Sequence, residues 1–235
     1  MFSVFVVPKI SSTDFMVVEG DEAHHAIKVI RLEIGEEIVV TDGAGNWAQG
    51  HVSTIDKKSF TVTISRRGLE EPRQPELIVI QALTKSDRMR ETIELLTVAG
   101  VDRIIPWKAD RSIAQEKENS VEKWNAVAVA ASKQSRRLRF PVIEGAITTP
   151  QVVERFAGKL IVLHESAAHK FSDLKFIDSD PVVIVVGPEG GISEIELAKL
   201  CGLSGTPVRL GQEVFRSAHA GFAALSAIQV LIKRW

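Results

Sequence analysis

Residues 1–66 consist of short hydrophobic runs separated by turn residues, a pattern typical of a small β domain. One interruption is helical, because Ala23, Ile27 and Ile30 recur at helix spacing between Asp21 and Leu32. The predicted strands cover residues 2–7, 36–42, 46–55 and 59–67. We therefore expect a barrel-like or sandwich-like β domain with one helix.

The pattern changes after residues 68–75, which contain two prolines and no periodicity and are interpreted as a linker. From Leu77 onward, short all-apolar runs alternate with amphipathic segments, as in a parallel sheet covered on both faces. Strands are predicted at 77–83, 103–107, 160–164, 182–187 and 207–211. Helices are predicted from Ser86 or Asp87 to Gly100, after Asn119, from the capping box at Ser193–Glu196, and over 217–233.

Composition places the chain among globular proteins, with 45% hydrophobic and 25% charged residues. No apolar run reaches the roughly 18 residues that cross a bilayer, and the N-terminus lacks the features of a secretion signal. One cysteine, Cys201, forms neither a disulfide framework nor a cysteine-based metal site by itself. We expect a cytoplasmic protein with no membrane partner, no metal and no covalent intermediate.

The net charge of −1 conceals an asymmetry, since residues 1–72 carry −4 and residues 73–235 carry +3. A nucleic-acid surface would therefore be a local patch. Four cations without an intervening acid form the densest candidate: Lys133, Arg136, Arg137 and Arg139. A solvated helix end explains this cluster equally well.

The loop Gly187-Pro-Glu-Gly-Gly191 follows a predicted strand and precedes a capped helix, where open α/β sheets bind ligands. Its spacing is not that of a dinucleotide fingerprint, and Glu189 would repel a phosphate. A ligand with hydroxyls, an amine or a positive centre suits the loop better. The alternative is a tight turn that needs glycine for its backbone conformation.

A second glycine loop, Leu210–Arg216, leads into a helix rich in small residues. Eight of the 11 residues from Ser217 to Ala227 are Ser, Ala or Gly, which predicts close packing against another segment or a second subunit. Alanines that merely favour helix are the alternative. Arg216 at the junction could stabilise negative charge on a substrate, or could form a salt bridge.

Taken together, these motifs resemble the ribosomal RNA small-subunit methyltransferase E family, which methylates nitrogen-3 of a 16S rRNA uridine with S-adenosylmethionine. The similarity runs along most of the chain: His24-His25 to Gly35, Lys85 to Met89, Gly100 to Pro106, Arg111-Ser112, Trp124, Gln134 to Arg136, Pro141, the GPEGG loop with Ser193 and Glu196, Leu210-Gly211 and Phe215-Arg216. The resemblance implies a PUA-like β-barrel over 1–70. It further implies an α/β SPOUT domain with a C-terminal trefoil knot over 71–235.

The resemblance also implies site residues. Arg216 and Glu189 become the catalytic candidates, with Arg216 stabilising charge on the uracil oxygens. The cofactor is expected between the loops after strands 160–164, 182–187 and 207–211. Its expected ligands are Leu163, His164, Glu165, Gly187, Gly190, Gly191, Leu210, Gly211, Val214, Phe215 and Ala218. The expected contacts to 16S rRNA in the 30S subunit are His25, Lys28, Arg31, Lys85, Arg88, Arg111, Arg136 and Arg137.

Several positions depart from the usual family pattern, among them Leu95, which replaces a basic residue, and three positions that lack an acid the family often has. Val98 replaces an acidic residue, Lys133 replaces a glutamate, and Ala218 stands where the family often has an acid. Two alternatives therefore remain: another SPOUT enzyme, such as a tRNA ribose methyltransferase, and a non-catalytic RNA-binding or assembly factor. A homodimer with the helix 217–233 at or beside the interface is expected.

Overall fold

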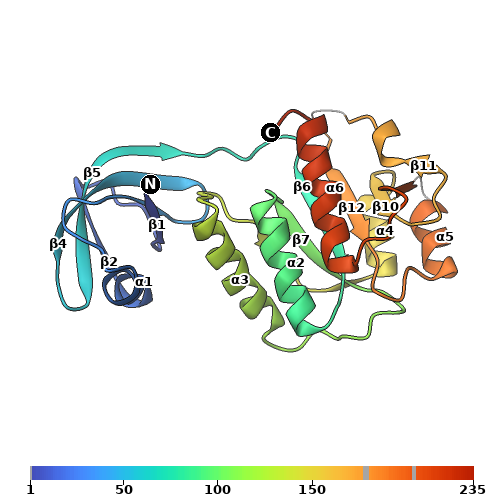
Figure 1. Cartoon of the computed structure of the whole chain (residues 1–235), viewed down its shortest axis with the longest axis horizontal. Coiled ribbons are helices and arrows are strands. Elements are labelled where there is room, and N and C mark those ends of the chain that lie inside the picture. The colour runs from blue at the N-terminus through green and yellow to red at the C-terminus, as the bar shows by residue number, and fades with distance from the viewer. Residues whose placement is uncertain (1, 177–179, 203–204) are drawn as a thin grey trace. The chain divides into compact units, whose positions relative to one another are not determined.

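The computed structural model describes residues 2–176, 180–202 and 205–235, which form two compact units (Figure 1). The first unit comprises residues 1–72 and 129–140, and the second comprises residues 73–128 and 141–235. The sequence at 70–76 carries no regular secondary structure and includes a cis Gln74–Pro75 bond. Each unit has a hydrophobic core of its own.

The first unit is a five-stranded sheet in the order β1-β3-β4-β5-β2, so that β1 and β2 are its edges. The strands are β1 (Ser3–Val6), β2 (Phe15–Glu19), β3 (Glu37–Thr41), β4 (Asn46–Ile55) and β5 (Ser59–Leu69). The expected helix occurs as α1 (Gly20–His25) continued by a π-helix, η1 (Ala26–Ile30). Strand β2 was not predicted, although Met16 and Val18 alternate into the core with exposed neighbours.

Residues 129–140 belong to the first unit, which corrects the expectation that Arg136 and Arg137 lie in the domain over 71–235. Hydrogen bonds explain the assignment. Thr41 Oγ1 donates to the Leu138 carbonyl at 2.7 Å, and the Phe140 amide donates to the Gly43 carbonyl at 2.8 Å. With this segment, the first unit carries 11 basic and 11 acidic residues, so its net charge is zero instead of the expected −4.

The described part of the second unit forms an eight-stranded parallel sheet in the order β11-β13-β10-β12-β6-β7-β8, with β9 also paired to β7. Its longer strands are β6 (Leu77–Ala82), β7 (Arg103–Lys108), β10 (Leu160–Leu163), β12 (Val182–Val186) and β13 (Thr206–Arg209). Its two-residue strands are β8 (Val142–Ile143), β9 (Ile147–Thr148) and β11 (His169–Lys170). All five predicted strands are confirmed.

Helices cover both faces of this sheet. On one face, α2 (Ser86–Val98) and α6 (Ser217–Leu231) pack side by side against the sheet core (Figure 1). On the other face lie α4 (Thr149–Phe156) and α5 (Glu194–Gly202). The remaining helix, α3 (Ser120–Gln134), runs from the second unit into the first, and η2 (Phe171–Asp173) is a short 3₁₀ turn. Helix α4 was not predicted.

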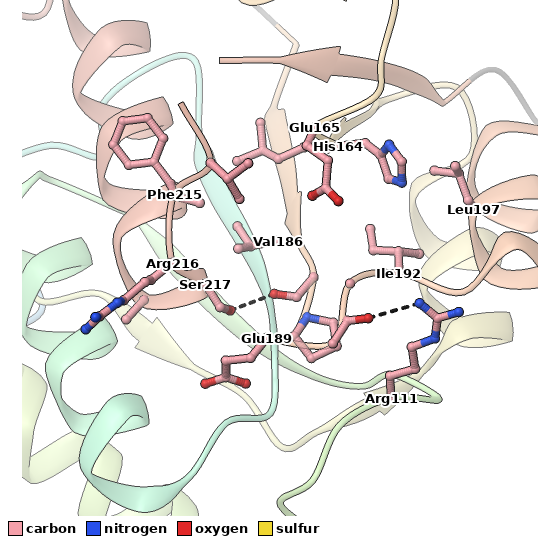
Figure 2. Close-up of a pocket in the computed structure, with 18 of the residues that line it drawn as sticks. Arg111, His164, Glu165, Val186, Glu189, Ile192, Leu197, Phe215, Arg216 and Ser217 are labelled. Atoms are coloured by element: carbon pink, nitrogen blue, oxygen red, sulfur yellow. Dashed lines mark hydrogen bonds between the residues drawn. The ribbon is translucent and has the colours of Figure 1, made fainter. Parts of the chain in front are cut away.

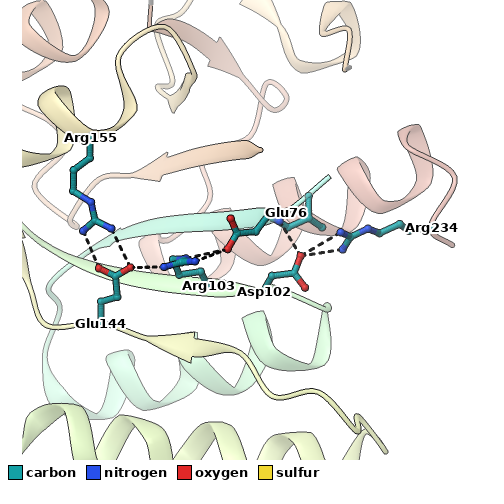
Figure 3. A network of polar contacts seen from close by, with 7 residues as sticks. Glu76, Asp102, Arg103, Glu144, Arg155 and Arg234 are labelled. Carbon is teal, nitrogen blue, oxygen red and sulfur yellow. Dashed lines mark hydrogen bonds and ion pairs between the residues drawn. The ribbon is translucent and has the colours of Figure 1, made fainter. Parts of the chain in front are cut away.

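The starts of the strands β6 and β7 are joined by ion pairs (Figure 3). Arg103 donates to Glu76 and to Glu144, and Arg155 also pairs with Glu144 at 2.8 Å. Hydrogen bonds from Arg155 and then Arg103 lower the pKa of the Glu144 carboxyl. Arg234 pairs with Asp102, whose carboxylate also accepts the Leu77 amide. This end of the sheet is therefore held by matched charges.

Candidate functional site

A pocket of about 1020 Å³ lies where β10 and β12 end and α6 begins, entirely within the second unit. This volume is at the upper end of the range for small-ligand sites. Three chain segments supply most of its walls: residues 163–166, 186–192 and 214–218. A smaller space of about 80 Å³ beside it is lined by residues 208–215 and 163–165. Strands β13, β10 and β12 are neighbours in the sheet, which brings these loops together.

The GPEGG loop closes one wall of the pocket (Figure 2). Gly191 has φ +73, a left-handed conformation that favours glycine. A Cβ added at Gly187 would lie 2.7 Å from Ile192 Cγ1, so the loop folds back tightly on its own start. Glu189 is exposed in this loop, and its carboxylate makes no ion pair with another described residue. The loop thus needs its glycines and presents a free carboxylate.

The start of α6 forms the facing wall. Arg216 is the N-cap residue of this helix, is exposed, and lines the pocket. Its guanidinium has no hydrogen-bond or ion-pair partner within the described ranges. Ser217, which follows it, is buried and donates a 2.6 Å hydrogen bond to the Gly187 carbonyl (Figure 2). The two walls are therefore bonded to each other beside a free arginine.

A second set of bonds fixes the GPEGG loop from the outside. Arg111 Nη1 donates to the Gly190 carbonyl at 3.0 Å (Figure 2). Glu196, with 1% of its surface exposed, accepts from the Asp110 amide and from Thr149 Oγ1. Ser193 Oγ accepts from the Glu196 amide at 3.2 Å, which is one half of the predicted capping box at α5, and the hydroxyl also contacts the Asp110 carboxylate at 3.0 Å. A buried carboxylate thus ties the loop after β7 to the start of α5.

The Glu91 carboxylate on α2 also connects this helix to α6. Glu91 accepts from Arg88 Nη1 at 2.8 Å and contacts His219 Nε2 at 3.1 Å. The hydrogen bonds from Arg88 and then His219 lower the pKa of the Glu91 carboxyl. Arg88 lines the pocket as well, but its charge is shared with Glu91. Of the two pocket arginines on this side, only Arg216 keeps an unshared charge among the described residues.

Comparison with known proteins identifies the family. Residues 70–229 match the model of the RNA methyltransferase domain, and residues 18–65 match the model of the RNA methyltransferase PUA domain. A ribosomal RNA small subunit methyltransferase E from Mycobacterium tuberculosis is 38% identical over 229 residues, which cover 93% of this chain and 87% of the relative. The chain belongs to the ribosomal RNA small subunit methyltransferase E family.

Two further relatives of this methyltransferase family agree. A Bacillus subtilis protein of the same name is 27% identical, covering 90% of this chain and 88% of the relative. A crystal structure of the Neisseria gonorrhoeae protein of that name, bound to S-adenosyl methionine, has a TM-score of 0.87, 24% identity and 98% coverage of both chains. The Neisseria structure shows that the fold is shared.

The structure brings most of the expected methyltransferase site residues into one place. Nine expected cofactor residues line the main pocket together with Glu189 and Arg216: Leu163, His164, Glu165, Gly187, Gly190, Gly191, Val214, Phe215 and Ala218. Leu210 and Gly211 line the smaller space beside it. The pocket combines apolar side chains with three carboxylates, Glu165, Glu189 and Glu194, and no lysine is among its described lining residues. This donor set fits a ligand with a sulfonium, ribose hydroxyls and an aromatic base.

The residues expected to contact RNA are divided between the units. Arg88 and Arg111 line the pocket, and Lys85 is exposed at the N-cap of α2. The others lie in the first unit: His25, Lys28, Arg31, Arg136 and Arg137. Lys133 bonds Glu22 at 2.6 Å, and Arg139 Nε bonds the Glu70 carbonyl at 2.9 Å. The cluster 133–139 is therefore not a row of free cations.

Several pocket residues were not predicted. Ser217 is the most informative, because its hydroxyl bonds the GPEGG loop. Others are Ser166, Pro188, Ile192, Glu194, Leu197 and Ala220. The Lys133 departure is explained by Glu22, while Val98 is 44% exposed and nothing in the structure explains it. Within the described residues, no group of His, Cys, Asp and Glu suits a metal ion, and no helix has the length and hydrophobicity of a membrane span.

Proposed function

We propose that this chain transfers a methyl group from S-adenosylmethionine to nitrogen-3 of one uridine of 16S rRNA in the 30S subunit. The observation that carries the proposal is the pocket at the ends of β10 and β12, where Arg216 and Glu189 are both unpaired among the described residues. Charges left free at a pocket are available to a substrate, whereas charges in salt bridges are not. Membership in the methyltransferase family supports methyl transfer as the reaction at this pocket.

The cofactor would be held by the three pocket segments. Leu163, Val214 and Phe215 provide apolar surface for its base, and Glu165 can accept hydrogen bonds from ribose hydroxyls or an amine. Gly190 and Gly191 let the backbone approach closely, since no side chain intervenes. When bound, S-adenosylmethionine supplies an electrophilic methyl group.

Arg216 is the group that stabilises charge in this proposal. Nitrogen-3 of uridine carries a proton, and its loss spreads negative charge to the two uracil oxygens. A guanidinium at the pocket can donate to such oxygens, and its charge is not already neutralised by an acid among the described residues. Glu189 lines the same pocket and can accept the proton or bind the ribose. The protein otherwise aligns the nitrogen with the methyl group.

Both units would bind RNA. The first unit offers Lys28 and Arg31, both exposed and without an ion-pair partner among the described residues, and it offers Arg136. The second unit offers Lys85 and Arg111 near the pocket. The match of residues 18–65 to the PUA domain supports an RNA-binding role for the first unit, and the second unit would carry the methyl transfer. The target uridine would be turned out of its helix into the pocket.

We further propose that the second unit is a SPOUT domain with a C-terminal trefoil knot. The support comes from the path after β13: this strand pairs with β10, yet α6 packs against β12 and β6. Because β10 lies between β13 and β12 in the sheet, the chain crosses the position of β10 on its way from β13 to α6.

A homodimer with α6 at the interface is part of the same proposal, and the enzyme would act in the cytoplasm, where 30S subunits are found. Val230 and Leu231 are exposed at the end of α6, which supports an interface there. Light scattering at micromolar concentration tests the dimer. A mass near 25.8 kDa, that of one chain, would contradict it.

The function is tested by methyl transfer from labelled cofactor into 30S subunits, followed by mapping of the modified nucleoside. We expect label in 16S rRNA as a nitrogen-3 methyluridine. Label in a ribose of tRNA would instead indicate the other SPOUT activity. Binding of 30S subunits without cofactor binding or turnover would indicate an assembly factor.

A further inference from the structure

A fully buried glutamine lies behind the pocket wall. Gln81 is in β6 with no exposed surface, and the sheet register places it beside Val186 at the end of β12. Gly187 and Ser217 line the pocket, whereas Gln81 does not. Any effect of Gln81 on a ligand must therefore pass through a neighbouring residue.

Two hydrogen bonds connect Gln81 to the pocket wall. Its Nε2 donates to Ser217 Oγ at 2.9 Å, and Ser217 Oγ donates to the Gly187 carbonyl at 2.6 Å. The direction is fixed by chemistry, because an amide NH₂ can only donate. Ser217 therefore accepts from Gln81 and has its single proton left for Gly187.

Close packing holds Gln81 in this position. Gly221 on α6 lies over it: an added Cβ would be 3.6 Å from Gln81 Oε1 and 3.3 Å from both Leu96 Cδ2 and Val186 Cγ2. The glutamine is thus enclosed between the sheet and α6. A side chain so confined keeps one rotamer, and its amide has a fixed donor direction.

We propose that Gln81 is a positioning residue that sets the spacing between the two walls of the pocket. It acts through Ser217, which joins the start of α6 to the first peptide of the GPEGG loop. Arg216 directly precedes Ser217, and Glu189 is two residues beyond Gly187. The assignment rests on the proposed function, since Arg216 and Glu189 are the two charges that this spacing aligns.

A control residue lies on α6, the helix that begins with Ser217. Gln229 is also fully buried, its Nε2 donates to the Ala99 carbonyl at 2.7 Å, and its Oε1 is unpartnered in the described chain, as is Oε1 of Gln81. Gln229 sits near the C-terminal end of α6, away from the residues that line the pocket. Both glutamines are fully buried and donate to a distant segment of the chain, but only the Gln81 amide bonds a residue that lines the pocket.

The first experiment compares Gln81→Met with Gln229→Met in the full-length protein. Methionine keeps the length of the side chain and removes the amide. We expect Gln81→Met to lower kcat for methyl transfer about tenfold, because misplaced catalytic groups lose rate steeply, while KM for the cofactor changes little. Gln229→Met should keep kcat near the wild-type value. Equal losses of kcat in the two variants would overturn the proposal.

The second experiment uses Gln81→Glu and varies pH. The introduced carboxyl can donate to Ser217 when neutral but only accept when ionised, which would draw the Ser217 proton away from Gly187. Burial raises the pKa of such a group. The ratio of variant to wild-type kcat should therefore fall as pH rises. A ratio independent of pH would contradict a directional hydrogen-bond relay.

A third readout does not depend on turnover. Amide hydrogen exchange should speed up in peptides covering 189–192 and 216–218 for Gln81→Met and stay unchanged for Gln229→Met. If the wild-type protein shows no methyl transfer, the proposed function fails, and the exchange comparison still decides whether Gln81 holds the two walls. Unchanged exchange in both variants would refute the relay even in an active enzyme.

Discussion

The two ends of the parallel sheet differ in how their charged side chains are paired. At the strand starts, Arg103 and Arg155 share Glu144, and Arg234 pairs with Asp102. At the strand ends, Arg216 and Glu189 line a pocket without ion-pair partners among the described residues. The side chains of Arg103 and Arg155 are 33% and 38% exposed, and Arg216 is exposed as well, so exposure to water alone does not explain why only the first two are paired.

The difference shows where the fold gains stability and where it keeps charge available. A paired, half-buried arginine contributes to folding but has little left to offer a ligand. An unpaired arginine at a pocket adds little to folding and can stabilise charge that develops on a substrate. Substitutions at the two ends should therefore separate turnover from stability.

The largest expected effect is on turnover at the strand ends. Arg216→Ala should lower kcat for methyl transfer about 100- to 1000-fold, the usual scale for loss of one charge-stabilising group, with cofactor affinity and melting temperature unchanged. Arg155→Ala is the matched control at the strand starts and should keep kcat near the wild-type value. Steady-state kinetics and thermal melts measure both. Near-normal turnover of Arg216→Ala would move the charge-stabilising role to another residue, and Arg88 would be tested next.

The next effect concerns two glycines with the same backbone conformation. Gly191 in the GPEGG loop has φ +73, and Gly158, just before β10, has φ +79. Valine strains the backbone at either position, but only Gly191 lines the pocket. Gly191→Val should weaken S-adenosylmethionine binding at least tenfold by calorimetry, whereas Gly158→Val should leave the affinity unchanged. Equal affinities in the two variants would place the cofactor elsewhere.

A smaller effect is expected on RNA binding by the first unit. Arg136 is exposed with φ +57, and its guanidinium lies 5.2 Å from the centre of the Phe2 ring. Arg136→Ala should weaken 30S binding several-fold and reduce the slope of log K against log salt by about 1, with cofactor affinity unchanged. Lys57→Ala, in the exposed β4–β5 turn, is the control. Equal salt slopes in both variants would exclude a phosphate contact at Arg136.

The smallest effect is on stability at the strand starts. Hydrogen bonds from Arg155 and Arg103 lower the pKa of Glu144, so this carboxylate stabilises the folded state at pH values above its ordinary pKa. That contribution is lost as pH falls through the lowered pKa. Glu144→Gln should reduce the unfolding free energy by about 1 kcal/mol at pH 7, and the difference should shrink below pH ~4.5. A difference that is constant with pH in urea denaturation would contradict this.

The sequence predicted the sheet of the second unit well, because buried parallel strands are continuous apolar runs such as 182–186. It missed β2, because Ser11–Asp14 appear as a turn and only Met16 and Val18 alternate inward. The pocket loops were predictable because they follow strands with glycine. The Gln81–Ser217 bond was not, since 136 residues separate its partners and neither belongs to a local motif.

The pairing of Lys133 with Glu22 and the assignment of 129–140 to the first unit have the same origin. Lys133 and Glu22 are 111 residues apart, and the hydrophobic periodicity of a helix does not reveal which of the two units the helix packs against. Charge counts along the chain misled for this reason, because they assigned four cations to the wrong unit.

The segment 129–140 also has a consequence for protein synthesis. A ribosome that has released residues 1–72 has not yet supplied the Leu138 carbonyl for Thr41, the Phe140 amide for Gly43, or Lys133 for Glu22. The N-terminal unit therefore stays incompletely folded while the next 68 residues are translated. A nascent chain stalled anywhere in that interval would expose an unfinished sheet, which is when a chaperone would have most to bind.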